Sequence, residues 1–485
     1  MAKNNFLLGR GEQLTHRVSV PTTGGPKNAP YTFSGARAVL APRVLDATKE
    51  FVALPLAARP KDQVVAVITM HPRYISKSDF PEHLLAAFGL RTVGSRVRRI
   101  QPRNWGVQNP PTDALTNDIF VAGPLNSFGN FARTLPSSSE TVRWAGDLTH
   151  IEDVVALTAD AKIRTISGTS PDEVEGDLYE FVIHNSHDRD IVPRFVSYAR
   201  SLQGEPLEKW RRDVGGLTFL PVRATPQLIH EIADFTFVRL ARVMPRLRVF
   251  RPDILRLTAN NTLNLPTAAA VDPEARVVIF DGGLPDSADL SPWVTRLEPE
   301  GIGAPDPDLQ EHGLAVTSAL LFGNLSPDRL PVGQPLCHVD HVRVLDAETD
   351  SDLEYFSVLD RIINHLEQSK GRYQFAGISL GPRHSIDDDD VTQWTARLDD
   401  CMSNGLTLTA VAAGNDGDLC PEAGLNRIQP PADGVNLLSV GACDSEEGAW
   451  CRAAYSCVGP GRAPGLVKPD GVTFGGTPSD LYLRK

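Results

Sequence analysis

Hydrophobic and polar positions divide the 485-residue chain into four regions. Residues 1–50 are rich in Gly, Pro, Thr and Asn, which predicts an irregular N-terminal arm. Residues 51–250 combine short apolar runs with helical patterns, which predicts an α+β domain. Residues 251–270 predict a linker, and strands and helices alternate regularly in residues 271–485.

The α+β domain contains a strand–helix–strand unit near its end. In that unit an apolar run precedes Thr225 and Pro226, which are typical of a helix start, and an alternating strand follows. The elements predicted in this domain are strands at residues 62–70 and 178–185, helices at 81–90 and 191–203, and the strand–helix–strand unit at 216–248.

Beyond residue 270 nearly all of the predicted strands are continuously apolar. Such strands are typical of a parallel sheet that is covered by helices on both faces. The sequence therefore predicts an α/β fold, and active sites in such sheets lie at the carboxyl ends of the strands. The predicted strands are 277–281, 341–346, 374–381, 406–413 and 436–442, and the predicted helices start near His312, Leu353 and Val391.

Composition and charge restrict the function classes. Hydrophobic residues make up 41% of the chain and charged residues 22%, as in globular proteins. The net charge of -12 disfavours a nucleic-acid partner, which requires a basic surface. No stretch approaches the ~20 apolar residues of a membrane span, and the N-terminus lacks the apolar core of a secretory signal. We therefore expect a cytoplasmic protein with no membrane partner.

Three polar residues of the α/β region lie where catalytic groups are expected. Asp281 ends an apolar strand and is followed by two glycines, so its carboxylate can be partly buried beside a close neighbour. His312 opens a helix rich in small residues, and Asn415 lies in a turn between Gly414 and Gly417. Each residue alone is typical of an ordinary turn or helix start. The order Asp, His, Asn on one α/β domain is what predicts chemistry.

The sequence also contains weaker candidates for metal and thiol chemistry. All six cysteines lie in the second half without a CxxC pair, which predicts reduced, mostly buried thiols. His338 and His341 lie on one strand at a spacing that puts them on opposite faces, so they cannot simply share a metal ion. The acidic run at 387–390 could hold calcium, although a solvated loop is the better interpretation. We therefore expect no cofactor.

Further motifs occur in register with these three residues. They are GISLG ending at Gly381, PADGVNLLSVGA from Pro431, AAYSCVGPG from Ala453 and VKPDGVTFGG from Val467. On these motifs, residues from roughly 270 to 476 resemble the catalytic domain of subtilisin-like serine proteases, the subtilases. The chain is similar to intracellular subtilases that carry a long N-terminal region.

The resemblance implies a role for each candidate residue. Asp281 would orient His312, His312 would act as general base and then as general acid, and Asn415 would donate its amide to the oxyanion. An edge strand that binds an extended polypeptide substrate would be formed by Ser379, Leu380 and Gly381.

The resemblance also bears on the N-terminal domain and on partners. Subtilases often have a prodomain that chaperones folding and occupies the cleft, and the unit at 216–248 resembles such an element. Intracellular subtilases of this kind occur beside AAA-type ATPases, so the resemblance implies an AAA-type ATPase as a partner.

The nucleophile departs from the family pattern. The family's serine lies in a Gly-Thr-Ser segment that opens a long helix of small residues. Here Thr477 is followed by Pro478, and Ser479 comes one position later, so we interpret Ser479 as a loop serine. We therefore expect a C-terminally incomplete peptidase domain without peptidase activity. A catalytically inactive peptide-binding or regulatory module is the alternative.

An α/β-hydrolase is a weaker alternative. The segment Gly377–Gly381 matches the G-x-S-x-G nucleophile elbow, which requires an acid and then a histidine further along the chain. The last histidine is His384, only five residues after Ser379, so the sequence disfavours this function.

Overall fold

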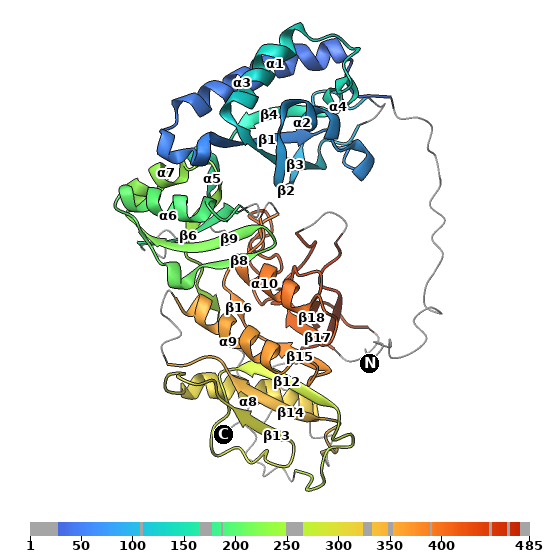
Figure 1. Cartoon of the computed structure of the whole chain (residues 1–485). Helices are drawn as coiled ribbons and strands as arrows, with labels where there is room; N and C mark the ends of the chain where they lie inside the picture. Colours follow the sequence, from blue (N-terminus) through green and yellow to red (C-terminus); the bar gives the residue numbers. More distant parts are fainter. Residues whose placement is uncertain are drawn as a thin grey trace. The chain divides into compact units, whose positions relative to one another are not determined.

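The computed structural model describes most of the chain (Figure 1). The described residues are 28–106, 110–164, 177–185, 188–248, 265–323, 332–347, 353–388, 390–445, 449–462 and 466–475. The chain forms two compact units. The first comprises residues 1–164, 181–207 and 216–241, and the second comprises 165–180, 208–215 and 242–485.

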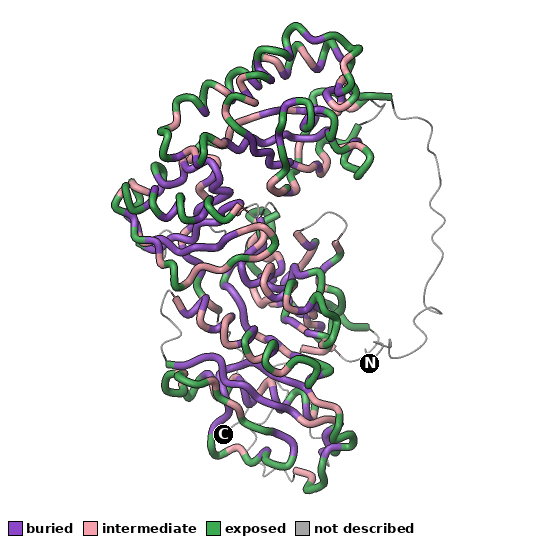
Figure 2. The backbone as a smooth tube through the Cα atoms, viewed as in Figure 1, coloured by how far each residue is buried: buried purple, intermediate pink, exposed green. Residues whose placement is uncertain are grey.

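The first unit contains an antiparallel sheet with helices packed on one face (Figure 1). Its strand order is β2-β3-β1-β4. Alternate residues of β1, from Val64 to Met70, pack with the helices in one buried core (Figure 2). The elements are α1 (Phe33–Ala53), β1 (Gln63–Met70), α2 (Glu82–Phe88), β2 (Arg91–Ile100), β3 (Ala114–Pro124), α3 (Leu125–Thr134), α4 (Ala145–Leu148) and β4 (Ile151–Ala156).

Helix α1 corrects the prediction of an irregular arm, which is wrong for residues 33–50; residues 1–27 lie outside the described residues. Thr32 caps the helix by accepting a hydrogen bond from the backbone N–H of Gly35 at 3.1 Å. Pro42 removes one backbone hydrogen bond inside the helix, and it obscures the helical pattern in the sequence. Burial of one face stabilises the helix nonetheless, through Phe33, Ala36, Leu40, Val44, Ala47 and Phe51.

The first unit carries most of a second sheet, in the order β5-β10-β6-β9-β7. The predicted strand–helix–strand unit is confirmed as β9 (Leu217–Arg223), α7 (Pro226–Ala233) and β10 (Val238–Val243). The strand predicted at 178–185 and the helix predicted at 191–203 are confirmed as β6 and α6. The other elements are α5 (Ala159–Lys162), β5 (Ile163–Arg164), β6 (Leu178–His184), α6 (Ile191–Ser201), β7 (Glu205–Pro206) and β8 (Arg212–Val214).

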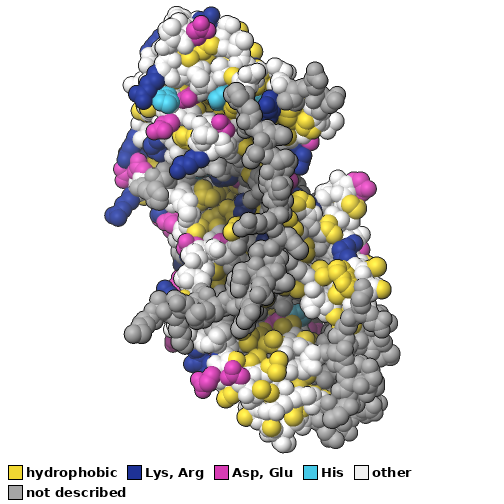
Figure 3. Space-filling model, turned by 90° about the vertical axis from the view of Figure 1, so that its right-hand side faces the viewer, with side chains coloured by type: hydrophobic (Ala, Val, Ile, Leu, Met, Phe, Trp, Pro, Cys, Tyr) yellow, Lys and Arg dark blue, Asp and Glu magenta, His cyan; other side chains and the backbone are white. Residues whose placement is uncertain are grey.

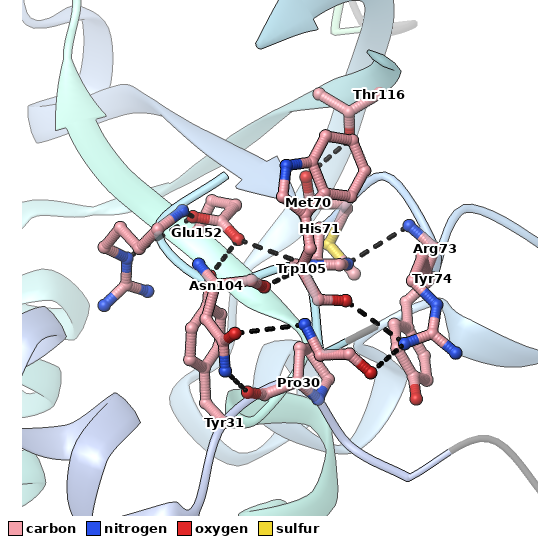
Figure 4. A network of polar contacts seen from close by, with 12 residues as sticks. Pro30, Tyr31, Met70, His71, Arg73, Tyr74, Asn104, Trp105, Thr116 and Glu152 are labelled. Carbon is pink, nitrogen blue, oxygen red and sulfur yellow. Dashed lines mark hydrogen bonds and ion pairs between the residues drawn. The ribbon is translucent and has the colours of Figure 1, made fainter. Parts of the chain in front are cut away.

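A buried polar network follows β1 in the first unit (Figure 4). The Nδ1 atom of His71 accepts a hydrogen bond from the backbone N–H of Arg73 at 3.1 Å, so Nε2–H donates to the carbonyl of Asn104 at 2.9 Å. Burial lowers the pKa of His71, which favours this neutral form. The Glu152 carboxylate accepts from the hydroxyl of Tyr31, and this contact attaches the segment before α1 to β4.

The second unit contains a seven-stranded sheet in which every neighbouring pair is parallel, in the order β13-β14-β12-β15-β17-β18-β19. This confirms the predicted α/β fold, a parallel sheet with helices on both faces. The elements are β11 (Leu247–Arg248), β12 (Arg276–Asp281), β13 (Val294–Leu297), α8 (Pro307–Phe322), β14 (His338–Arg343), α9 (Glu354–Gln368), β15 (Phe375–Ile378), β16 (Gly381–Pro382), α10 (Gln393–Met402), β17 (Leu408–Ala412), β18 (Leu438–Cys443) and β19 (Gly471–Phe474).

Neighbouring residues of β12 show which helix covers which face. Ile279 packs with Leu314 and Leu321 of α8 in one core. Phe280 points to the other face, where its ring lies 5.7 Å from the ring of His365 in α9. The predicted linker, 251–270, is described only from residue 265, and residues 265–270 contain no helix or strand.

Part of the α8 side of the sheet is open. Val277 pairs with Phe375, and Phe375 pairs with Leu408, so these side chains lie on the face where α8 covers β12. Phe375 is 36% exposed and Leu408 is 50% exposed. Hydrophobic side chains of the second unit also reach the surface in Figure 3. Parallel sheets are normally covered on both faces, so these two exposed side chains mark a partly uncovered strip of the described sheet.

The structure also bears on the membrane and on the thiols. No described helix combines the length and the apolar character that crossing a membrane requires. All six cysteines are free, but only Cys443 and Cys457 are buried, so the expectation of mostly buried thiols is wrong. Cys420 and Cys451 are exposed because they lie in loops at the end of the sheet.

Candidate active site

Helix α8 presents His312 from its interior. The helix begins at Pro307, so the prediction that His312 opens it is wrong. Asp306 caps the helix by accepting hydrogen bonds from the backbone N–H groups of Asp308 at 2.8 Å and Leu309 at 3.2 Å. A capping aspartate followed by a proline at the first helical position is a helix-start signal in the sequence. The backbone of His312 is thus helical both before and after this residue.

Asp281 and His312 form a hydrogen-bonded pair at the carboxyl end of β12. The Nδ1 atom of His312 lies 2.8 Å from Oδ1 and 3.0 Å from Oδ2 of Asp281. The Asp281 side chain is buried, whereas 17% of the His312 side chain is exposed. The backbone N–H of Gly282 donates a second hydrogen bond to Oδ1 at 2.7 Å. A buried carboxylate that accepts from Nδ1–H favours the tautomer of His312 with its proton on Nδ1.

Three glycines allow α8 to approach the turn after β12 this closely. A Cβ atom on Gly282 would lie 2.5 Å from the carbonyl oxygen of Leu309, and one on Gly313 would lie 2.1 Å from the carbonyl oxygen of Gly283. Gly283 itself has a φ of 96°, which disfavours other residues. The glycines that the sequence places after Asp281 and His312 are therefore required for the contact between their side chains.

A second histidine lies next to this pair and was missed as part of the site. The Nδ1 atom of His341 lies 2.8 Å from the hydroxyl of Thr317, which itself donates to the carbonyl of Gly313 at 2.8 Å. Nδ1–H is therefore the donor to Thr317, and Nε2 has no hydrogen-bond partner among the described residues. Burial lowers the pKa of His341 to about 4. His341 supports α8 as a neutral side chain.

Asn415 lies in a tight turn after β17. Gly414 has a φ of 110°, and a Cβ atom on Gly417 would lie 2.1 Å from the carbonyl oxygen of Ser456. The backbone N–H of Asp416 contacts the sulfur of Cys457 at 3.3 Å. Both glycines are needed, as the sequence predicts, and the turn is backed by a segment that comes later in the chain.

A cavity joins Asn415 to the predicted substrate strand. It is about 30 Å³ in volume. The sequence placed Asn415 and the strand in the site, but it did not identify the opposite end of the cavity, which Gln429 and Pro430 form. The lining residues are Ser379, Leu380, Gly381, Pro382, Ala412, Gly414, Asn415, Gln429 and Pro430.

The edge of the substrate strand is occupied by a segment of this chain. Strand β11 pairs antiparallel with β16, with Arg248 opposite Gly381 and Leu247 opposite Pro382. The backbone N–H of Arg383 donates to the carbonyl of Arg246 at 2.9 Å. Of the predicted edge strand Ser379–Gly381, only Gly381 lies in a strand, and the partner of that strand is β11 of the same chain.

The candidate residues form two groups at one end of the sheet. Asp281 and His312 are paired at the end of β12, and Asn415 lines the cavity at the end of β17, two strands away in the order β12-β15-β17. Two strand spacings are roughly 9–10 Å. A reacting group placed between the two clusters would be within reach of both.

Two other predictions concern the nucleophile and metals. Ser479 lies outside the described residues. Among the described side chains, no group of three His, Cys, Asp or Glu could hold a metal ion. His338 is hydrogen-bonded to Thr295 at 2.9 Å, whereas His341 faces α8, so the two histidines point to different faces as predicted. Residue 389 of the acidic run lies outside the described part of the chain.

The chain was compared with known proteins. No protein-family model and no curated protein matches it. Among solved structures, the prenylagaramide maturation protease PagA is 21% identical over 42% of this chain and 64% of its own, with a TM-score of 0.29. A mutant of the protease domain of PatA is 21% identical over 39% of this chain and 64% of its own, with a TM-score of 0.28. The chain thus covers less than two thirds of either protein.

Proposed function

We propose that the second unit, from residue 271 onward, carries the acid–base and oxyanion groups of a subtilisin-type serine endopeptidase. The hydrogen bond between Asp281 and His312 is the observation that carries this proposal. Nδ1–H of His312 is donated to Asp281, so Nε2 takes the proton from an attacking hydroxyl and later gives it to the leaving amine. The buried carboxylate stabilises the positive charge that His312 carries between the two steps.

Asn415 and the substrate strand supply the other interactions. Asn415 lines the cavity, and its side-chain amide donates to the negative oxygen of a tetrahedral intermediate. Ser379, Leu380 and Gly381 hold the polypeptide by backbone hydrogen bonds, as Gly381 already does with Arg248 of the same chain. A cytoplasmic location, the absence of a cofactor and an AAA-type ATPase partner remain proposals from the sequence.

The nucleophilic serine is assigned to a residue other than Ser479. Pro478 occupies the position that the family gives to the serine, so this proposal expects no hydrolysis by residues 1–485. A fluorophosphonate probe that labels Ser479 would contradict it.

Alkylation of His312 tests the acid–base centre without a serine. A tetrapeptide chloromethyl ketone places its methylene carbon beside the histidine, whose Nε2 displaces chloride to form a carbon–nitrogen bond. We expect one adduct, on His312, identified by peptide mass spectrometry, and a rate at least about tenfold lower in Asp281→Asn, because the tautomer is no longer fixed. His338 is an internal control, since 20% of its side chain is exposed against 17% for His312. Equal labelling of both histidines would refute the proposal.

A catalytically inactive peptide-binding module is the second candidate. The pairing of β11 with β16 favours it, since that contact needs neither Asp281 nor His312. A fluorescent peptide distinguishes the two functions when its affinity is measured for the wild type and for His312→Ala. If the chain is an inactive module, the wild type and His312→Ala bind the peptide with equal affinity, and the chloromethyl ketone does not alkylate His312. If His312 is an active-site residue, the chloromethyl ketone alkylates it in the wild type.

A further inference from the structure

A groove in the first unit lies between the segment after β1 and the outer strand of the first sheet, β2. Its volume is about 390 Å³, and it is partly open to solvent. Two of its lining residues, Met70 and Ile119, are buried. Two others, Ile75 and Phe80, are each 40% exposed. Apolar side chains gathered in a concave surface with a few polar groups are typical of a binding site.

The polar groups of this groove have no partners in the described part of the chain. Ser95 lies opposite Ile119 in the sheet, and Asn117 lies two residues before Ile119, so both side chains are on the face that the groove occupies. Neither side chain makes a hydrogen bond to a described residue, and the exposed ammonium of Lys77 forms no ion pair with one. A hydroxyl, an amide and a positive charge are therefore available to a ligand.

The outer edge of β2 runs beside this groove. β2 is the last strand in the order β2-β3-β1-β4 (Figure 1). The carbonyl of Ser95 accepts a hydrogen bond from the Arg239 side chain at 3.0 Å, so it points away from β3. Because outward groups recur at every second residue of an antiparallel strand, the backbone groups of Val97 and Arg99 point outward as well. No described strand pairs with them there, so an extended polypeptide can add to this edge.

The charge of β2 favours an acidic polypeptide. The strand contains four arginines and no acidic residue. Arg96 is committed to the buried carboxylate of Asp118 at 3.0 Å, on the other face of the sheet. Arg99 is on the groove's face, and its contact with Asp113 at 3.0 Å is an exposed ion pair, which contributes little. Arginines on an edge strand also deter aggregation, but that role requires no groove beside them.

We propose that this groove and the outer edge of β2 form a second polypeptide-binding site, for an extended acidic segment that carries one large apolar side chain. The backbone of the segment pairs with β2 beyond Ser95. Its alternate side chains then point to the groove's face, where the apolar one contacts Met70 and Ile119. Its carboxylates lie near Lys77 and Arg99. The site recognises a polypeptide in the first unit and does not depend on the proposed function.

Labelled peptides measure the two kinds of contact separately. A fluorescein-labelled acidic octapeptide with a central leucine is titrated into the full chain and followed by anisotropy. We expect replacement of the leucine by serine to weaken binding at least about tenfold, the order that burial of a leucine side chain gives. Replacement of every carboxylate by a carboxamide should weaken binding at least about fivefold in dilute buffer. That difference should shrink in about 1 M salt, which screens exposed charges.

A charge reversal at the groove tests the position of the acidic segment. Lys77→Glu should weaken binding of the octapeptide at least about fivefold, because it replaces attraction by repulsion. Lys49→Glu is the matched control, since Lys49 is an exposed lysine of the same unit, on α1, and the net charge changes equally. The control should keep the wild-type affinity. Equal weakening in both variants would overturn the proposed site.

Photocross-linking locates the bound peptide in the unaltered chain. Benzophenone in place of the leucine side chain takes a hydrogen atom from a nearby C–H group on irradiation, and the two carbons then join. We expect peptide mass spectrometry to find the adduct within residues 70–80, 92–95 or 117–119. Adducts confined to residues 379–383 would place the peptide at β16 and overturn the proposal. Equal binding of the leucine and serine peptides, or no binding up to about 1 mM, would overturn it as well.

Discussion

Replacing Gly313 by alanine adds one methyl group at the contact between α8 and the turn after β12. The new Cβ atom would lie 2.1 Å from the carbonyl oxygen of Gly283 and 3.0 Å from Cε1 of His341. Ordinary contact begins at 3.4 Å, so the helix and the turn must separate by about 1 Å. The same movement lengthens the 2.8 Å contact between His312 and Asp281 beyond hydrogen-bonding distance.

The expected loss of stability follows from three contributions. Alanine favours a helix interior over glycine by about 1 kcal/mol, which opposes the effect. Overpacking costs about 1–3 kcal/mol, and loss of a hydrogen bond to a buried carboxylate costs about 1.5–3 kcal/mol. We therefore expect Gly313→Ala to lower the free energy of unfolding by about 3 kcal/mol, with the largest structural change at His312.

Two measurements check this prediction. Urea unfolding gives the stability, and long-range proton–nitrogen NMR shows whether Nδ1 of His312 still carries the proton. Gly333→Ala is the matched control, because a Cβ atom there meets nothing within 4 Å and its φ is not positive. The reasoning is refuted if Gly313→Ala is as stable as Gly333→Ala and keeps the Nδ1–H tautomer.

Two further predictions concern His341 and β11. The pKa of His341 is lowered to about 4, so its neutral form stabilises the fold above an unfolded value near 6.5 and this stability is lost as the pH falls. His341→Asn keeps a donor for Thr317 but does not titrate. Between pH 7 and pH 5 the wild type should therefore lose about 2 kcal/mol more unfolding free energy than this variant, as measured by chemical denaturation. Equal losses in the two proteins would refute the prediction. Replacing Leu247 and Arg248 together by glycine should weaken β11 and raise the affinity for a labelled peptide about tenfold, because the edge of β16 is freed. The same change at Ala268 and Ala269 is the control, and an unchanged affinity in the β11 variant would show that peptide and β11 do not compete.

The elements that the sequence predicts correctly are those whose pattern is local. Continuously apolar runs predict the central strands, and an apolar face ended by glycine predicts α9 and α10. The sequence does not predict helix α1 because Pro42 lies inside it, and burial of its apolar face in the core of the first unit stabilises it. The first residue of α8 was predicted wrongly, because the helix was placed from His312 and its cap, Asp306, lies six residues earlier.

Some residues of the candidate site can also be predicted from local sequence, and others cannot. Asp281, His312 and Asn415 follow strand ends or lie near glycines, which the sequence displays, and their order indicates a common site. Gln429 could not be predicted, because it reaches the cavity only through pairing of its segment with Ala413 and Val458. The pairing of β11 with β16 likewise joins segments more than 130 residues apart, for which no local pattern exists.

The charges around Asp281 explain why its partner must be His312. A buried carboxylate is costly unless a hydrogen-bond donor or a positive charge accompanies it. His341 is close enough to interact with Asp281, but its low pKa keeps it neutral and its Nδ1–H is donated to Thr317. The positive charge that can best compensate Asp281 is therefore the one that His312 acquires when Nε2 takes a proton. In the proposed reaction the buried Asp281 carboxylate stabilises that positive charge, while His341 stays neutral beside it.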